Sequence, residues 1–449
     1  MTRSPEVNVL SAYRATESRV PSAFHSGGFK KGSGGEIELI EAESLFAPST
    51  ARTLTGALLT TDAYPSPDAC AKCHTEIHDN WQASMHAVSA TDDWYLRVKD
   101  FLAFEQGEAE VRLCAGCHAP VALATGEVGL YNRESAASEQ GVSCIFCHTL
   151  ESVGTKNGEW VSDPGRVRTY KGGDYLAADE TENAAHLVMA APGVHKADMT
   201  RSFYQSSEVC ASCHQFELNG VKLQSTYEEW ENSSYAEQGI GCQDCHFTLG
   251  AGATIPDPGK LVSAYPEHEH IYRHTLTGGS TVAVSDRNLD NLRDAVSLEA
   301  SLSDKELSVT VYNRLAGHHI PTGVADMRQL WLEVTAMDDT GNTVYSSGVL
   351  DAAGYLPKDA TVFHQVLGNA HGGQIELHDI WNATEILEDT RIPANGSHTA
   401  TFAVPDNALD ISVRLLWRDA PAAFVSRVLN TNANNLPIAE LATWHAAIQ

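Results

Sequence analysis

Cysteine and histidine are the residues in this sequence whose spacing points most directly to chemistry. All ten cysteines fall into five copies of one pattern, C-x-x-C-H, and none is left over. Paired cysteines alone would fit a disulfide framework, metal sites or redox dithiols. The five motifs are Cys70-Ala-Lys-Cys73-His74, Cys114-Ala-Gly-Cys117-His118, Cys144-Ile-Phe-Cys147-His148, Cys210-Ala-Ser-Cys213-His214 and Cys242-Gln-Asp-Cys245-His246.

The histidine that closes each motif favours covalent attachment of haem. In C-x-x-C-H the two thiols add to the two vinyl groups at one edge of a haem, and the histidine reaches the iron from the proximal side. Zinc and dithiol sites require only C-x-x-C and give no reason for the histidine. The sequence therefore predicts five covalent haem c groups with five irons, whose proximal ligands are His74, His118, His148, His214 and His246.

Each iron has a second axial position, and histidine is the expected ligand there. The chain has 20 histidines, of which five are proximal, so fifteen remain, whereas it has only six methionines. Met85, Met189 and Met199 stand in settings that suit packing. Ligation by two histidines implies lower potentials than His/Met ligation and closed irons that transfer electrons.

Five other histidines stand in settings that suggest a role. His86 in WQASMHA follows the first motif, His195 precedes the fourth, and His274 in YRHTLTGG follows the fifth. His318 and His319 lie in AGHHIPTG, a turn bounded by glycine and proline. A single histidine is commonly a solvated surface residue, but five irons that need partners favour ligation.

The elements that must position these residues divide the chain into four parts. Residues 1–60 form an N-terminal arm with a Gly/Ser-rich, basic segment, HSGGFKKGSGG, and a short helix expected in EIELIEAESLF. Residues 61–294 carry all five motifs and are expected to form short helices with little other regular structure, because haems fill the core. The second and third motifs, and the fourth and fifth, are closest in sequence, which suggests two close haem pairs.

The remainder of the chain changes character. Residues 295–420 lack cysteine, and AVSLEASLSDKELSVTVYNRL, RQLWLEVTAMDDTGNTVYSSGVL and HTATFAVPDNALDISVRLLWRD predict strands joined by turns. Residues 421–449 are expected to form a helix, a loop and a second helix. The predicted fold is α + β and multidomain: a haem-packed, mostly helical or irregular domain followed by an antiparallel β-sandwich.

Several segments resemble a known group of proteins. CHTEIHDNWQASMHA, YEEWENSSYAEQGIGCQDCH and GHHIPTG resemble the multihaem cytochromes related to hydroxylamine oxidoreductase and its tetrahaem electron acceptor. DTRIPANGSHTATFAVP and VRLLWRDAPAAF are similar to a subgroup that joins such a haem domain to a β-sandwich. The resemblance extends over residues 64–449 and implies that the distal ligands include His86, His195, His274 and His318.

The resemblance leaves the fifth distal ligand open. His186, His268 and His270 are candidates near the motifs, and His25 lies in the arm. In some relatives that polymerise into conductive filaments, a histidine of one subunit ligates a haem of the next, so His25 is a candidate for that role. Catalytic relatives have one haem left open, bound through lysine or cross-linked to tyrosine. Here no C-x-x-C-K occurs, which counts against nitrite-reductase-like chemistry.

Charge and hydropathy restrict the partners and the compartment. The 30 basic and 58 acidic residues give a formal charge of -28, which argues against nucleic acid and favours a basic redox partner. No apolar run of roughly 18 residues predicts a membrane span. Haem is attached to C-x-x-C-H outside the cytoplasm, so we expect a periplasmic or extracellular protein. Because MTRSPEVNVLSAYRATE lacks an apolar core, the export signal is expected upstream of this numbering.

Three functions compete at this stage. The first is an electron carrier or conduit, either a discrete protein or a subunit of a haem filament. The second is an oxidoreductase that acts on small nitrogen or sulfur oxyanions at one open haem, which requires a high-spin iron. The third gives the sandwich its own binding role for polysaccharide, mineral or protein, beyond supporting the haem domain and supplying His318.

The number of haems is directly testable. The intact mass of the mature protein should exceed the polypeptide mass by five haem groups, because each motif supplies two thioether bonds. Mass spectrometry under denaturing conditions preserves these bonds and measures the number. A mass that corresponds to four haems or fewer would contradict the interpretation of all five motifs.

Overall fold

The computed structural model describes residues 43–129, 135–166, 192–248, 258–276, 278 and 286–448. The chain divides into two units, residues 1–41 and residues 42–449, and only the second unit contains described residues. Two candidate ligands, His25 and His186, therefore lie outside the described residues. Within the described ranges, no helix is long and apolar enough to cross a membrane.

The motif-bearing region consists of short helices, as the sequence predicts. Four of the five motifs lie in helices that end on their proximal histidine, so one helical turn carries both cysteines on one side. The first motif instead runs from the end of α2 to His74, which caps α3. The helices of this region are α2 (Pro67–Ala71), α3 (Thr75–Gln82), α4 (Met85–Val88), α5 (Asp93–Gln106), α6 (Val111–His118), α7 (Pro120–Thr125), α8 (Cys144–His148), α10 (Pro192–Met199), α11 (Glu208–His214), α12 (Thr226–Glu231), α13 (Ser234–Glu237), α14 (Cys242–His246) and α15 (Asp286–Ala295).

The described end of the arm belongs to this region rather than to a separate part. Helix α1 (Glu43–Phe46) lies within the segment where a helix is predicted, and β1 (Arg52–Thr53) pairs in parallel with β3 (Trp160–Ser162), which also pairs with β2 (Leu150–Val153). Phe46 and Ala51 are buried in a cluster with Trp160. Apolar side chains before residue 60 therefore pack into the core of the motif-bearing region.

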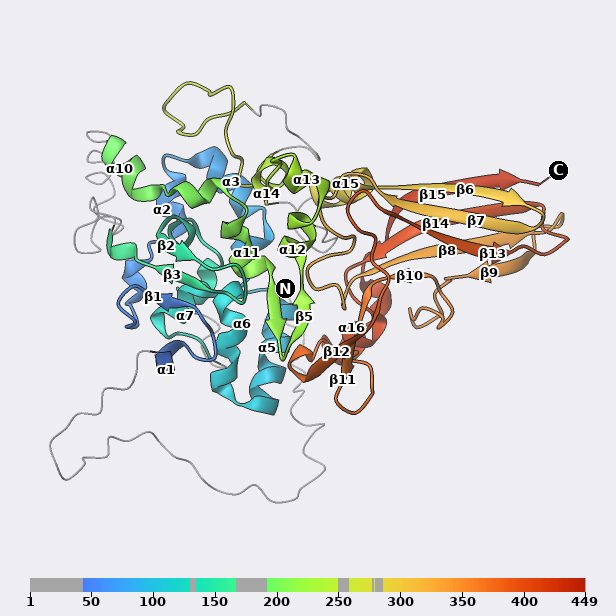
Figure 1. Ribbon diagram of the computed structural model, residues 1–449, viewed down its shortest axis with the longest axis horizontal. Coiled ribbons are helices and arrows are strands. Elements are labelled where there is room, and N and C mark those ends of the chain that lie inside the picture. The colour runs from blue at the N-terminus through green and yellow to red at the C-terminus, as the bar shows by residue number, and fades with distance from the viewer. Residues whose placement is uncertain are drawn as a thin grey trace, which may run out of the picture. The chain divides into compact units, whose positions relative to one another are not determined.

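The second half forms the predicted antiparallel β-sandwich (Figure 1). One sheet has the order β13-β7-β6, and the other has the order β10-β8-β14-β15 with β9 paired to β8. Buried and less buried residues alternate along β7, and the buried ones join a single apolar core with residues of β8 and β14. The strands are β6 (Val296–Ser303), β7 (Glu306–Asn313), β8 (Gln329–Met337), β9 (Thr343–Ser347), β10 (Val362–Phe363), β13 (Ser397–Ala403), β14 (Asp410–Arg418) and β15 (Ala439–Ala447).

Two hairpins lie outside these sheets. Strands β4 (Phe216–Leu218) and β5 (Val221–Gln224) pair between the fourth and fifth motifs, and β11 (Gln365–Asn369) pairs with β12 (Ala383–Asp389). Side chains of the two hairpins share a buried cluster that includes Leu223 and Leu367. The β11–β12 hairpin thereby packs against the motif-bearing region.

The C-terminal tail corrects one prediction. The first helix predicted within residues 421–449 is present as α16 (Ala422–Arg427), but the second is replaced by strand β15. Residues of β15 pair with β14 from Asp410↔Ala447 to Trp417↔Ala439. The exposed edge of β14 supplies backbone partners that an isolated helix in this segment would lack, and this tertiary pairing overrides local propensity.

Candidate haem sites

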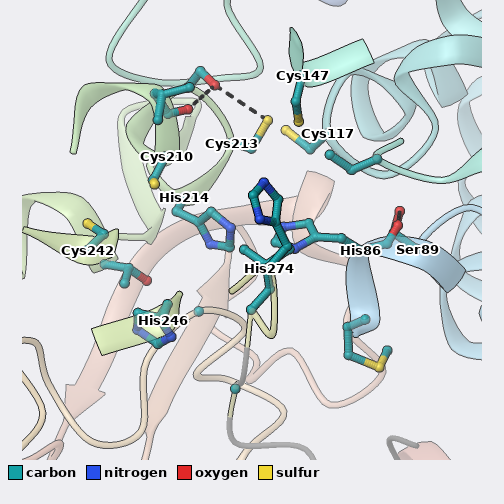
Figure 2. A pocket seen from close by; sticks show the side chains of 18 of the residues that line it. His86, Ser89, Cys117, Cys147, Cys210, Cys213, His214, Cys242, His246 and His274 are labelled. Atoms are coloured by element: carbon teal, nitrogen blue, oxygen red, sulfur yellow. Dashed lines mark hydrogen bonds between the residues drawn. The ribbon is translucent and has the colours of Figure 1, made fainter. Parts of the chain in front are cut away.

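A single cavity connects all five motifs. It has a volume of about 1360 Å³, and all ten motif cysteines and all five proximal histidines line it. Figure 2 shows motif thiols and imidazoles from several helices directed into this space. None of the ten cysteines forms a disulfide, so a disulfide framework is not formed. Among the described residues, no group of three or more metal-ligating side chains could hold a metal ion by itself.

Four of the five proximal histidines face a second histidine across the cavity. The second members are His86, His195, His274 and His318, the four residues to which the family resemblance points. The ring centroids lie 6.2 Å apart in His74–His195, 6.1 Å in His86–His214, 6.2 Å in His148–His274 and 6.3 Å in His246–His318.

These separations suit an iron placed between two imidazoles. Metal–imidazole nitrogen bonds are roughly 2 Å long, so two of them on opposite sides of one metal place the nitrogens about 4 Å apart. The rest of each centroid separation is the distance from each bonded nitrogen to the centroid of its own ring. Direct stacking contact between rings would be closer, whereas unrelated histidines would not repeat one separation four times. The residues present therefore fit haem with two histidine ligands.

Hydrogen bonds orient the ring nitrogens in most of these pairs. A carbonyl oxygen can only accept, so an imidazole Nδ1 bonded to one must carry the proton, which leaves Nε2 free to bind metal. Such bonds join His74 to Leu261 (2.7 Å), His148 to Met199 (2.8 Å), His274 to Tyr272 (2.9 Å) and His318 to His319 (2.9 Å).

Burial favours the neutral form, the form that binds metal, in four of these imidazoles. Burial, followed by the nearby imidazoles of His214 and His246, lowers the pKa of His86 to about 3. Burial, followed by His148, lowers the pKa of His274 to about 4. Burial also lowers the pKa of His195 and of His214.

The segment before the third motif holds His86 in place. The Val142 N–H donates to the carbonyl oxygen of His86 (2.9 Å), and Trp81 Nε1 donates to the Val142 carbonyl (2.9 Å). Gly141 has φ +57°, and a side chain there would collide with the same His86 carbonyl. Helix α4, which carries His86, is therefore held in place by the turn at Gly141, which is distant from it in sequence.

His274 is held in an extended segment after the fifth motif. The Arg273 N–H donates to the Phe247 carbonyl (2.7 Å), and the Leu276 N–H donates to the His246 carbonyl (2.8 Å). The Arg273 side chain forms an ion pair with Glu76 of α3. These contacts join the segment to the ends of two haem-binding helices.

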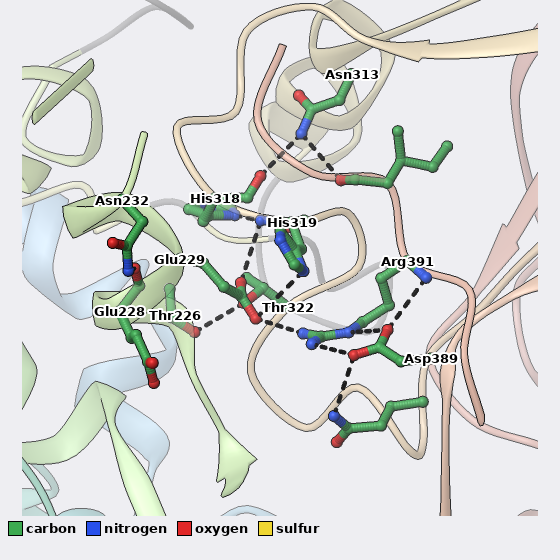
Figure 3. Close-up of polar contacts among 12 residues, drawn as sticks. Thr226, Glu228, Glu229, Asn232, Asn313, His318, His319, Thr322, Asp389 and Arg391 are labelled. Atoms are coloured by element: carbon green, nitrogen blue, oxygen red, sulfur yellow. Dashed lines mark hydrogen bonds and ion pairs between the residues drawn. The ribbon is translucent and has the colours of Figure 1, made fainter. Parts of the chain in front are cut away.

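His318 lies in the loop between β7 and β8, which a buried carboxylate anchors to helix α12 (Figure 3). Glu229 accepts hydrogen bonds from the His319 N–H (3.1 Å) and the Thr322 hydroxyl (2.6 Å). It also pairs with Arg391 (2.5 Å), and both side chains are about 5% exposed or less. On the other side, Asn313 Nδ2 donates to the His318 carbonyl (2.8 Å). The loop is thus fixed on both sides of the imidazole.

The remaining proximal histidine, His118, has a different environment. The Tyr95 ring stacks on its imidazole at 4.7 Å with an interplanar angle of 7°. Burial, followed by the nearby His378 imidazole, lowers the pKa of His118 to about 4. His378 lines the same cavity, although no sequence motif around it indicates a ligand.

Of the other candidates for the fifth ligand, the two that the structure describes, His268 and His270, do not line this cavity. His270 is exposed and its ring contacts Tyr272, with centroids 5.1 Å apart. His268 forms a backbone bridge with Gly259. His25 and His186 lie outside the described residues.

Thiols from different motifs meet inside the cavity. The sulfur atoms of Cys70 and Cys144, of Cys117 and Cys213, and of Cys210 and Cys242 lie near one another. The first motif therefore lies beside the third, the second beside the fourth, and the fourth beside the fifth. Spacing suggested two close haem pairs, the second with the third motif and the fourth with the fifth. Only the fourth and fifth motifs share such a contact, because the chain folds so that the first motif lies beside the third and the second beside the fourth.

Comparison with known proteins places these motifs in a recognised context. A family model described as cytochrome c554 and c-prime matches residues 69–149, which contain the first three motifs. The structure of a penta-heme cytochrome c552 from Thermochromatium tepidum is similar at a TM-score of 0.60 and 21% identity, covering 86% of this chain and 100% of that chain. No curated protein matches.

The motifs, the cavity and these similarities lead to one conclusion. The similarity to cytochrome c552 extends over both the helical region and the antiparallel sheets, so the whole fold is shared. The family match is confined to the part of the chain that carries the first three motifs. The chain is a multihaem c-type cytochrome.

Proposed function

We propose that this chain is a pentahaem electron-transfer protein whose haems are closely spaced and closed by two histidine ligands each. The observation that carries the proposal is the set of four facing imidazole pairs around one cavity that all five motifs line. The pentahaem count of the similar cytochrome c552 agrees with the five motifs of this chain.

The side chains around the cavity suit electron transfer better than substrate binding. When bound, haem supplies one-electron redox chemistry. Imidazoles on both sides of an iron occupy the positions that a substrate would need. Aromatic residues such as Trp81, Trp160 and Trp230 line the cavity and limit the access of water to it.

The thiol contacts support an order for the attachment sites. They join the first motif to the third and the fourth motif to the fifth, and Cys147 of the third motif interacts electrostatically with Cys213 of the fourth. The second motif joins the fourth through Cys117. We propose an electron path in the order first, third, fourth and fifth, with the second site as a branch at the fourth.

Charge and attachment chemistry indicate the setting. Since haem is joined to C-x-x-C-H outside the cytoplasm, we propose a periplasmic or extracellular location. A formal charge of -28 suits a basic redox partner, whose approach it would accelerate. We favour a discrete carrier over a filament subunit, since the filament version depends on His25 as a ligand for another chain.

Electron paramagnetic resonance, combined with a spectroelectrochemical titration, tests this function. We expect five low-spin irons that are reduced and reoxidised reversibly. The alternative oxidoreductase would show a high-spin iron and would consume nitrite, hydroxylamine or sulfite when supplied with reductant. Sustained turnover of any of these would contradict a role in electron transfer alone.

The choice between the adjacent histidines of the sandwich loop is testable. His318→Ala should convert one iron in five to high spin and raise its potential, because His318 faces His246 whereas the His319 ring lies beside Glu229. His319→Ala is the matched control and should leave every iron low-spin. A high-spin iron in the His319→Ala variant, with every iron low-spin in the His318→Ala variant, would show that His319 is the ligand instead.

The carboxylate of Glu229 should hold the His318 loop. Glu229→Ala removes a partner of the buried Arg391 guanidinium and the acceptor of the His319 N–H, so we expect a loss of about 3 kcal/mol in unfolding free energy. The same variant should bind added cyanide faster at one haem. Glu231→Ala, an exposed change on the same helix, is the control. Equal stability and equal cyanide binding in both variants would show that the loop does not depend on Glu229.

A further inference from the structure

We propose that His378 is the distal ligand of the haem attached at Cys114, Cys117 and His118, and that Asp326 positions it. This assignment rests on the proposed function, because it completes the fifth pair of histidines. It concerns a residue of the sandwich half that no motif singles out.

The histidines that line the cavity leave few alternatives. Besides the five proximal histidines and their four facing partners, three described histidines line it, namely His78, His319 and His378. His78 lies 3.6 Å from both Asp68 and Asp79. His319 lies 3.7 Å from Glu229. His378 is the one of the three that interacts electrostatically with His118.

The loop that carries His378 is held against the helix that contacts His118. It connects β11 with β12 and includes Trp381, whose ring packs on Phe101 of α5 with centroids 5.4 Å apart. Trp381 Nε1 also donates to Glu105 at the end of α5 (2.8 Å). The same helix supplies Tyr95, which stacks on His118. One rigid helix therefore sets the position of both histidines.

Asp326 orients the His378 ring. Its Oδ2 lies 2.7 Å from His378 Nδ1, and the two side chains are 6% and 11% exposed. A buried carboxylate at this distance accepts the Nδ1 proton, so Nε2 keeps the lone pair that binds metal. This is the carboxylate–histidine arrangement that supports many protein metal ligands, and it makes the imidazole a stronger donor.

The backbone at His378 is also unusual. Its φ is +61°, in the left-handed region that residues other than glycine rarely adopt. Such a conformation is unfavourable by itself and persists where surrounding contacts require it. The contacts of Trp381 and Asp326 on either side of the loop meet that requirement, and together they direct the imidazole to the cavity that it lines.

One loop of the sandwich then serves two haems. The segment between β7 and β8 contains both His318, which faces His246, and Asp326, which holds His378. Under this assignment all five haems have two histidines from the same chain. No ligand from a neighbouring subunit is then required.

The spin states of matched variants test the assignment. His378→Ala should keep five haems by intact mass but convert one of five irons from low spin to high spin, and added imidazole should restore the low-spin signal. His371→Ala, an exposed change in the same hairpin, should match the wild type. His378→Met should stay low-spin with a raised potential at one haem, which tests the site if the alanine variant does not fold.

Asp326→Asn separates positioning from ligation. The amide is a weaker acceptor for the Nδ1 proton, so one haem should gain a more positive potential while all five stay low-spin, and Asp326→Glu should restore part of the difference. If Asp326 had only a structural role, Asp326→Asn would lower stability without changing the potential of one haem alone.

Two results would overturn the assignment. The first is a high-spin iron in the wild type that the change His378→Ala does not affect. The second is a His378→Ala protein in which all five irons stay low-spin, while His186→Ala or His25→Ala converts one iron to high spin. Both leave electron transfer through the other haems intact. The proposed function fails separately, if the haems of the wild type are not reversibly reduced or if the protein turns over an oxyanion.

Discussion

The facing of imidazoles in pairs around one cavity, at the separation that a shared iron would need, is the constraint on which the rest of this structure depends. The facing rings lie 6.1 to 6.3 Å apart in four pairs, and in each pair the two histidines come from different elements. A shift of one ångström in either element would lengthen a coordinate bond beyond its normal range. The glycine turn beneath His86, the extended segment around His274 and the loop of His318 all serve to prevent such shifts.

The same constraint explains the form of the motif-bearing region. Its helices are mostly one or two turns long, and helices of that length are unstable in water without tertiary contacts. The protein side chains enclose a cavity of about 1360 Å³ instead of filling it. Covalently attached haem supplies the apolar surface on which those helices pack. Folding of this region is therefore coupled to haem attachment, whereas the sandwich has a continuous apolar core of its own.

The sandwich is more than a support for the haem region. It carries His318, which faces His246, and Glu229 of α12, paired with the buried Arg391, accepts hydrogen bonds from the loop of His318. Buried ion pairs add little net stability, because desolvation offsets their attraction, but they strongly disfavour arrangements that separate the partners. This pair thus specifies the register between the sandwich and helix α12, and that register holds the loop in which His318 faces His246.

The sequence by itself determined where haem attaches and what kind of fold surrounds it. Attachment depends on five consecutive residues, and the sandwich strands show their period of two locally, so both can be read without a structure. The settings of His86, His195, His274 and His318 suggested a role, and the family resemblance implied that this role is distal ligation. The second predicted tail helix became β15 because an open strand edge lay beside it, and the order of neighbouring motifs followed chain crossings rather than spacing. His378 carries no local signal at all: only tertiary structure brings it, with Asp326, to the cavity at His118, because a distal position is defined by packing in space and any part of the chain can supply it.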